Sequence, residues 1–280
     1  MSRFKEYLNL LSKTYEEAIG FLLQKYGPAQ DDYFREKSYQ RFMNGEIKSI
    51  AKGKISRTNA GLYCHHIDEN KWLKMADFNF VRKYNIPFES QKKDRLVYCD
   101  LIEHSILHAL ISKETDSEFG SPGYEAYLKP KVEMWYLDKI IPDSGWEKFC
   151  YNKSFLEAEE AFNILKSMEN KLGGSYYNTL SDYNEEIMKR EVERIGWLKK
   201  REQRRINQRH ESITYAKQLD SKDPRESIVS TSYSIYIEYQ DPKDIYRKNI
   251  AMTYEEYKSK MMKYTKEEIL DDLLTYIESL

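Results

Sequence analysis

The stretch that decides the fold is Leu96-Val-Tyr-Cys-Asp-Leu-Ile-Glu-His-Ser-Ile-Leu-His108. Asp100 stands before an apolar run and Glu103 follows it by three positions, which is the pattern of a capping box at a helix start. Apolar residues then recur with the period of a helix. We therefore expect a helix after Asp100. His104 and His108 should share one of its faces, because residues four apart are neighbours on a helix.

A second histidine pair lies upstream, in Gly61-Leu-Tyr-Cys-His-His-Ile67. This segment predicts a short buried strand, since it is apolar and aromatic apart from the pair. Adjacent side chains on a strand point to opposite faces, so His65 and His66 are not expected to bind the same ion. One of them, with the two helical imidazoles, would complete a metal site with an open position. The other would be free to act as a general base, and the set suits water attack on a phosphodiester.

Over residues 57–112 these motifs resemble the HNH nuclease motif, also called the ββα-metal or His-Me finger. The similarity is strongest to members with a His-His pair and a terminal His-x-x-x-His, such as the nuclease domains of DNase colicins. The resemblance implies that His65, His104 and His108 bind one divalent ion and that His66 is the base that activates water. It favours Zn²⁺, with Mg²⁺, Mn²⁺ or Ni²⁺ as alternatives, and products with 5′-phosphate ends.

The family carries an asparagine nine residues before the first helical histidine, where it pins the loop between the strands. Here that position is Arg95. Arginine lacks the acceptor of an amide, but it can hold phosphate through charge-assisted hydrogen bonds. We therefore include Arg95 with His66 among the candidate catalytic residues. The alternative hypothesis is a catalytically impaired HNH-like finger that serves as a DNA-binding or protein-binding module.

Four basic residues precede the predicted strand, with only Glu46 opposing them: Lys48, Lys52, Lys54 and Arg57. Beside a nuclease site they would contact backbone phosphates. The alternative is an ordinary solvated loop.

The composition limits the class of protein. The chain has 280 residues, with 45 Lys and Arg against 46 Asp and Glu, so a nucleic-acid contact must use local patches. No apolar run approaches the length of a membrane helix, and charges interrupt the apolar positions of the N-terminus. Three cysteines make neither a disulfide framework nor a zinc knuckle. We expect a cytoplasmic metal-dependent endonuclease with no membrane partner, with DNA favoured over RNA as substrate. A homodimer is one way to cut both strands.

The expected fold class is α+β, mostly helical, with the finger embedded between helical regions. The expected regions are an N-terminal helical region (1–56), the finger (57–112), a helical region (113–181), a long charged helix (182–217) and a C-terminal α+β region (218–280). Residues 3–26 predict one helix that ends at Gly27-Pro28. The stretch Ser232-Tyr-Ser-Ile-Tyr-Ile-Glu-Tyr239 predicts a strand, because polar and apolar residues alternate, and two acidic helices follow it.

Overall fold

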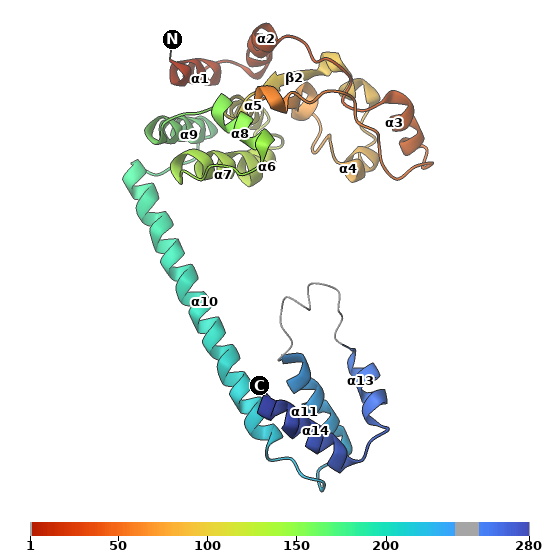
Figure 1. The fold of residues 1–280 in the computed structure, drawn as a ribbon. Helices are drawn as coiled ribbons and strands as arrows, with labels where there is room; N and C mark the ends of the chain where they lie inside the picture. The colour runs from red at the N-terminus through yellow and green to blue at the C-terminus, as the bar shows by residue number, and fades with distance from the viewer. Residues whose placement is uncertain (1, 239–251, 280) are drawn as a thin grey trace. The chain divides into compact units, whose positions relative to one another are not determined.

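The computed structural model describes residues 2–238 and 252–279 (Figure 1). The chain divides into two compact units, Met1–Asn184 and Glu185–Leu280, and the boundary falls inside one long helix. Within the described residues, no helix has the length and apolar character that crossing a membrane requires. The described residues are mostly helical and include a small two-stranded sheet, in agreement with the expected α+β class.

Helices make up most of the first unit. They are α1 (Arg3–Leu11), α2 (Tyr15–Tyr26), α3 (Glu36–Met43), α4 (Phe78–Lys83), α5 (Leu101–Glu114), α6 (Ser121–Gly123), α7 (Lys129–Val132), α8 (Gly145–Lys153), α9 (Ala158–Leu172) and the start of α10 (Leu180–Ala216). Strands β1 (Tyr63–His66) and β2 (Leu96–Cys99) form the sheet, and π-helical turns flank α7 to make residues 121–137 one helical run.

The single helix expected over residues 3–26 is wrong in its middle, where the chain breaks into α1 and α2. Thr14 adopts an extended backbone, its side chain accepts from the Glu17 amide, and the Glu17 carboxylate accepts from the Thr14 amide. This capping box satisfies amides at a helix start, so it favours a new helix over continuation of the old one. The second helix ends at Gly27 as expected, with the positive φ that glycine tolerates.

The sheet pairs β1 and β2 antiparallel, so that His65 lies opposite Val97 and His66 opposite Leu96. β2 leads through Asp100 directly into α5, and the predicted capping box between Asp100 and Glu103 is present. Helix α5 is buried on almost every side and contacts α1, α2 and α9. A helix that is apolar all round belongs in the middle of a unit, and α5 therefore gives its histidines a fixed position.

The second unit contains the rest of α10 with α11 (Arg225–Glu238), α13 (Tyr254–Met261) and α14 (Lys266–Ser279). The long charged helix is present as α10. Two further helices follow α11, as expected, but α14 alone is acidic, because α13 has two glutamates and two lysines. The strand expected over 232–239 is wrong, because residues 232–238 belong to α11, while Tyr239 lies outside the described residues. The buried side chains of α11 include Ile228, Ser232 and Ile235, which have helical spacing. Packing of that face against α13 and α14 outweighs the local alternation.

Candidate metal centre

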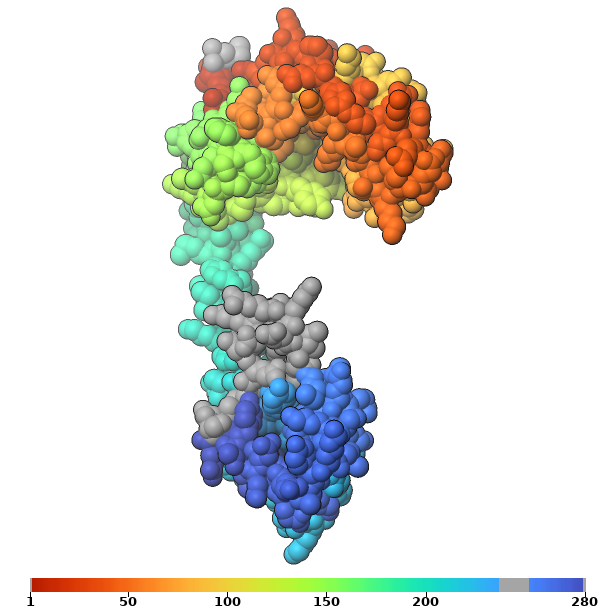
Figure 2. Space-filling model, turned by 45° about the vertical axis from the view of Figure 1, so that its right-hand side comes forward, coloured from red at the N-terminus to blue at the C-terminus, as the bar shows by residue number. Residues whose placement is uncertain are grey.

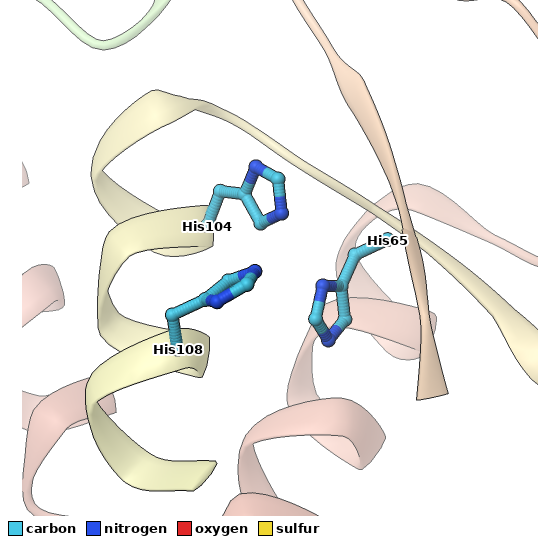
Figure 3. Close-up of side chains that lie close together, drawn as sticks. All are labelled: His65, His104 and His108. Atoms are coloured by element: carbon cyan, nitrogen blue, oxygen red, sulfur yellow. The ribbon is translucent and has the colours of Figure 1, made fainter. Parts of the chain in front are cut away.

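Three histidines from β1 and α5 converge on one shared space (Figure 3). The ring centres of His65 and His104 lie 5.2 Å apart, those of His65 and His108 lie 5.3 Å apart, and those of His104 and His108 lie 4.9 Å apart. One ring nitrogen of each lies within 4.8 Å of the other two. The sequence predicted these three side chains as a set, and the structure brings them together as a group that could hold a metal ion.

The hydrogen bonds of His65 decide which of its nitrogens can act as a ligand. The Tyr15 hydroxyl donates to the Ile67 carbonyl, at 2.9 Å, so its oxygen accepts from His65 Nε2–H, also at 2.9 Å. The lone pair therefore lies on His65 Nδ1, which is buried and has no hydrogen-bond partner among the described residues. Ligand imidazoles commonly have their other nitrogen fixed in this way.

The two helical histidines fit the same arrangement. His108 Nδ1 donates to the Gly120 carbonyl at 3.0 Å, which leaves Nε2 facing the shared space. In Figure 3 the His104 nitrogen directed toward the other two rings is Nε2, while Nδ1 points away from them and is buried without a hydrogen-bond partner among the residues that the structure describes. An unpaired buried polar atom such as His65 Nδ1 is costly, and a borderline-soft ion such as Zn²⁺ would satisfy a set of imidazole nitrogens. The donor set thus fits a metal ion.

Glu69 is the charged neighbour of this space. Its Oε2 lies 3.1 Å from His108 Nε2, and its Oε1 lies 3.6 Å from the Nδ1 atoms of both His65 and His66. Burial opposes a charge on Glu69, but the facing imidazoles of His65 and His108 outweigh burial and hold its pKa well below the usual range. The carboxylate and a metal ion would therefore compete for His108 Nε2.

Because of Glu69 and burial, the pKa values of the three histidines shift in different directions. Burial lowers the pKa of His65 to about 3, against the attraction of Glu69. Burial also lowers the pKa of His104 well below its ordinary value, with His108 and His65 adding to the effect. For His108, burial acts in the same direction, but the hydrogen bond to Glu69 prevails and raises the pKa. Burial thus favours the neutral form of His65 and His104, the form in which an imidazole binds a metal, whereas Glu69 favours the protonated form of His108.

His66 faces a different environment from its neighbour, as the strand geometry predicted. Its ring packs 4.3 Å from that of Tyr33, centre to centre, and its Nε2 lies 3.0 Å from Gln91 Oε1. The Gln91 amide nitrogen donates to the Met75 carbonyl at 3.2 Å, so Oε1 is the acceptor for His66 Nε2–H. The lone pair of His66 therefore lies on Nδ1, the nitrogen directed toward Glu69.

Arg95 forms an ion pair with Asp68, which follows the histidine pair by two positions. Its guanidinium makes a two-point contact with the Asp68 carboxylate, in which Nε to Oδ2 measures 3.1 Å. Burial opposes ionisation of Asp68, but the hydrogen bonds from Arg95, Lys71 and Ser90 outweigh it and lower the pKa to about 2. Asp68 closely follows β1 and Arg95 directly precedes β2, so this ion pair joins the two ends of the connection over residues 67–95.

The four predicted phosphate contacts do not form one group. Lys52 reaches over the Tyr33 ring, with Nζ 5.6 Å from its centre, and that ring packs on His66. The Arg57 guanidinium donates to the Tyr26 carbonyl at 2.9 Å and lies over the Tyr98 ring. The side chains of Lys48 and Lys54 are exposed, and Lys48 borders a surface hollow.

Three residues of the site were not predicted: Tyr15, Glu69 and Gln91. Glu69 carries the clearest sequence signal, because it follows His65 by four positions and His66 by three in a stretch that forms a 3₁₀ turn. Tyr15 and Gln91 reach the site through tertiary contacts from distant segments, and one sequence offers no sign of them.

Searches for a matching family model, for similar curated proteins and for similar solved structures found no match. A function for this chain consequently has to be inferred from its own residues.

Proposed function

We propose that this protein is a metal-dependent HNH-type endonuclease that hydrolyses phosphodiester bonds, with DNA as the favoured substrate. The observation that carries the proposal is the convergence of His65, His104 and His108, in which His65 Nδ1 has no hydrogen-bond partner among the described residues. His66 follows His65 on the same strand. The order of the elements supports it, because two antiparallel strands followed by a helix surround the cluster, as in a ββα-metal finger.

The proposed metal ligands are His65, His104 and His108. A divalent ion there would stabilise negative charge on the scissile phosphate and the departing oxygen. Zn²⁺ suits three imidazoles, and Mg²⁺, Mn²⁺ or Ni²⁺ are alternatives for activity.

His66 is the proposed general base. Its Nδ1 carries the lone pair, so it would take the proton from a water whose oxygen attacks phosphorus. The bond between phosphorus and the 3′ oxygen then breaks, which leaves a 5′-phosphate and a 3′-hydroxyl. Gln91 holds the imidazole in the required tautomer by accepting from Nε2–H, and is therefore a positioning residue.

Arg95 takes a role that fits the finger although it is not the family's asparagine. Its ion pair with Asp68 ties together the two ends of the connection between the strands. This ion pair supports Arg95 as the residue that fixes the connection between β1 and β2. A direct contact between Arg95 and a phosphate is a separate prediction.

The test is cleavage of supercoiled plasmid by the purified protein with Mg²⁺, Mn²⁺ or Zn²⁺, and with EDTA. The His66→Ala variant should lose about a hundredfold or more of the rate, as expected for removal of a general base, and keep its metal. The control is His210→Ala, which removes an exposed histidine of α10 and should cut normally. Full cleavage by His66→Ala would refute the base assignment. The absence of metal-dependent cleavage of both DNA and RNA would refute the nuclease.

One observation favours the alternative, a finger that binds DNA or protein without cutting. His65 and His66 are both almost fully buried, which would also suit an ion with a purely structural role. The variant Arg95→Asn separates the two. A sharp gain of cleavage in that variant would indicate that the natural chain is impaired, whereas a loss would assign Arg95 a functional contact.

A further inference from the structure

A hollow of about 600 Å³ opens on the first unit between α3, the loop after it and α4. Helices α3 and α4 lie side by side at the surface there (Figures 1 and 2). Its lining residues are Phe42, Lys48, Ala76, Asp77, Phe78, Asn79, Arg82 and Lys83. The volume is within the range of about 300–1,000 Å³ that is typical of ligand pockets, so the hollow can take a group the size of a nucleotide. We call it the α4 groove.

The α4 groove is basic. Lys48, Arg82 and Lys83 contribute three positive charges, and within the described part of the chain no ion pair joins any of them to a carboxylate. The acid in the lining, Asp77, caps α4 by accepting from the amides of Asn79 and Phe80. Some other cations of this unit have acidic partners, as in the pair between Arg41 and Glu46, so the groove is distinguished by its three cations around one hollow. Unpaired cations around a hollow favour an anionic ligand.

Aromatic rings shape the groove and hold one of its cations. The Arg82 guanidinium lies 4.0 Å from the centre of the Phe42 ring and donates to the Phe42 carbonyl at 2.7 Å. Phe42 and Phe78 pack 5.8 Å apart, centre to centre, in the wall. A fixed guanidinium among rings and flexible lysines is a combination that nucleic-acid-binding surfaces use for phosphates.

The wall of the groove is continuous with the support of the candidate base. Phe78 packs on Phe34, with ring centres 5.9 Å apart, and Phe34 packs on Tyr33 at 4.9 Å. Tyr33 in turn packs on His66. The backbone of Met75, directly before Ala76 of the lining, accepts from Gln91, the residue that fixes the His66 tautomer. A continuous series of packed rings thus joins the α4 groove to His66.

We propose that the α4 groove binds backbone phosphates of the nucleic acid that enters the metal centre, with Lys48 and Lys83 as the principal contacts. The inference rests on the proposed function for the identity of the ligand and extends it to a binding site outside the finger motif. The segment between the histidine pair and β2 thereby contributes to substrate binding, because it contains α4. Helix α4 binds the substrate strand at a second place, outside the site where the strand is cut.

The test is binding of a fluorescein-labelled DNA duplex, followed by anisotropy over a series of salt concentrations. All proteins carry His66→Ala and are loaded with Zn²⁺, so that binding is read without cutting. The groove variant adds Lys48→Gln and Lys83→Gln. The matched control adds Lys5→Gln and Lys113→Gln. These substitutions replace exposed lysines of α1 and α5 and remove the same amount of charge at other places.

The groove variant should bind about fivefold or more weakly, and the slope of log K against log salt should fall in magnitude by about 2, because two phosphate contacts are lost. The control should keep the slope of its parent. An unchanged slope in the groove variant, or an equal loss in the control, would overturn the proposal, as would a parent that binds no DNA. Melting curves of all three proteins exclude unfolding as the cause.

Failure of this proposal and failure of the nuclease are distinguishable. Metal-dependent plasmid cleavage by the wild-type chain, with an unchanged salt slope in the groove variant, would reject the groove and leave the nuclease standing. A reduced slope without any cleavage by the wild type would support the groove and reject the nuclease.

Discussion

The two sides of strand β1 present the same residue type to opposite environments. On one side, His65 faces two further imidazoles, and its Nδ1 has no hydrogen-bond partner among the described residues. On the other, His66 is held through Nε2 by Gln91 and packed against Tyr33. One side therefore presents three imidazoles that converge, whereas the other presents one imidazole in a fixed tautomer.

The difference shows how a strand of four residues could supply a ligand and a base without confusing them. Side chains alternate along a strand, so adjacent histidines acquire different partners, and those partners decide which nitrogen carries the lone pair. Glu69 lies where the two sides meet, 3.6 Å from Nδ1 of both His65 and His66. Four substitutions test this comparison, and the one that should change the protein most comes first.

Replacing His104 by Ala should remove both metal binding and cleavage, because two imidazoles remain where three converged. Zn²⁺ should stabilise the wild type by about 4 kcal/mol at a free concentration a thousand times the Kd, and the variant should gain nothing. Thermal unfolding with and without Zn²⁺ measures this, with His210→Ala as the control that keeps the full shift. An equal Zn²⁺ shift in His104→Ala would show that the ion binds elsewhere.

Gln91→Leu tests the other side of the strand. Without its acceptor the His66 ring is free to change tautomer, so cleavage should fall by about tenfold or more while metal content stays constant. The unpaired Met75 carbonyl should also cost about 1–3 kcal/mol of stability. Nitrogen chemical shifts of His66 report the tautomer, and Gln91→Glu, which keeps an acceptor, should retain the Nε2–H form. A normal cleavage rate in the Gln91→Leu variant would show that Gln91 does not position His66 for catalysis.

Glu69→Gln tests the group between the two sides through proton release. Glu69 raises the pKa of His108, so Zn²⁺ that binds His108 should displace more protons from the wild type than from the variant. His65, whose pKa is lowered to about 3, has none to lose. The wild-type affinity should therefore fall as the pH drops through the pKa of His108, and the variant should release fewer protons. Calorimetry in buffers of different ionisation enthalpy measures the number, and equal release would contradict the assignment.

Arg95→Gln should have the smallest effect, about 1 kcal/mol at neutral pH, because the guanidinium is partly exposed. The pKa of Asp68 is lowered from 3.8 to about 2, so the ion pair stabilises the fold above the ordinary value and this contribution disappears as the pH falls through 2. Urea unfolding at a series of pH values measures the difference, with Arg35→Gln as a surface-pair control. A difference that persists at the acid end would mean that Arg95 acts by another route.

The sequence predicted those parts of the site that local rules govern. The capping box of Asp100 and Glu103 indicated the start of α5, and helical spacing then placed His104 and His108 on one face. The alternation of a strand separated His65 from His66. Each of these inferences needs only a few neighbouring residues.

The rest depends on contacts that a single sequence does not encode locally. Gln91 meets His66 across a connection of irregular structure, and Tyr15 reaches His65 from α2. Tertiary packing also explains why the strand expected at 232–239 is wrong. The local alternation favours a strand, but the packing of one helical face of α11 on α13 and α14 outweighs it. Local pattern thus predicted which histidines come together, and tertiary packing determined what orients them.

We propose that the His65 side of β1 holds the ion and that the His66 side does not. The most direct measurement is the metal content, by elemental mass spectrometry, of the wild type, His66→Ala and His104→Ala after loading with Zn²⁺ and removal of excess. The account predicts one tightly held ion per chain in the wild type and in His66→Ala, and none in His104→Ala. Equal metal content in all three proteins, or loss of the ion in His66→Ala alone, would contradict it.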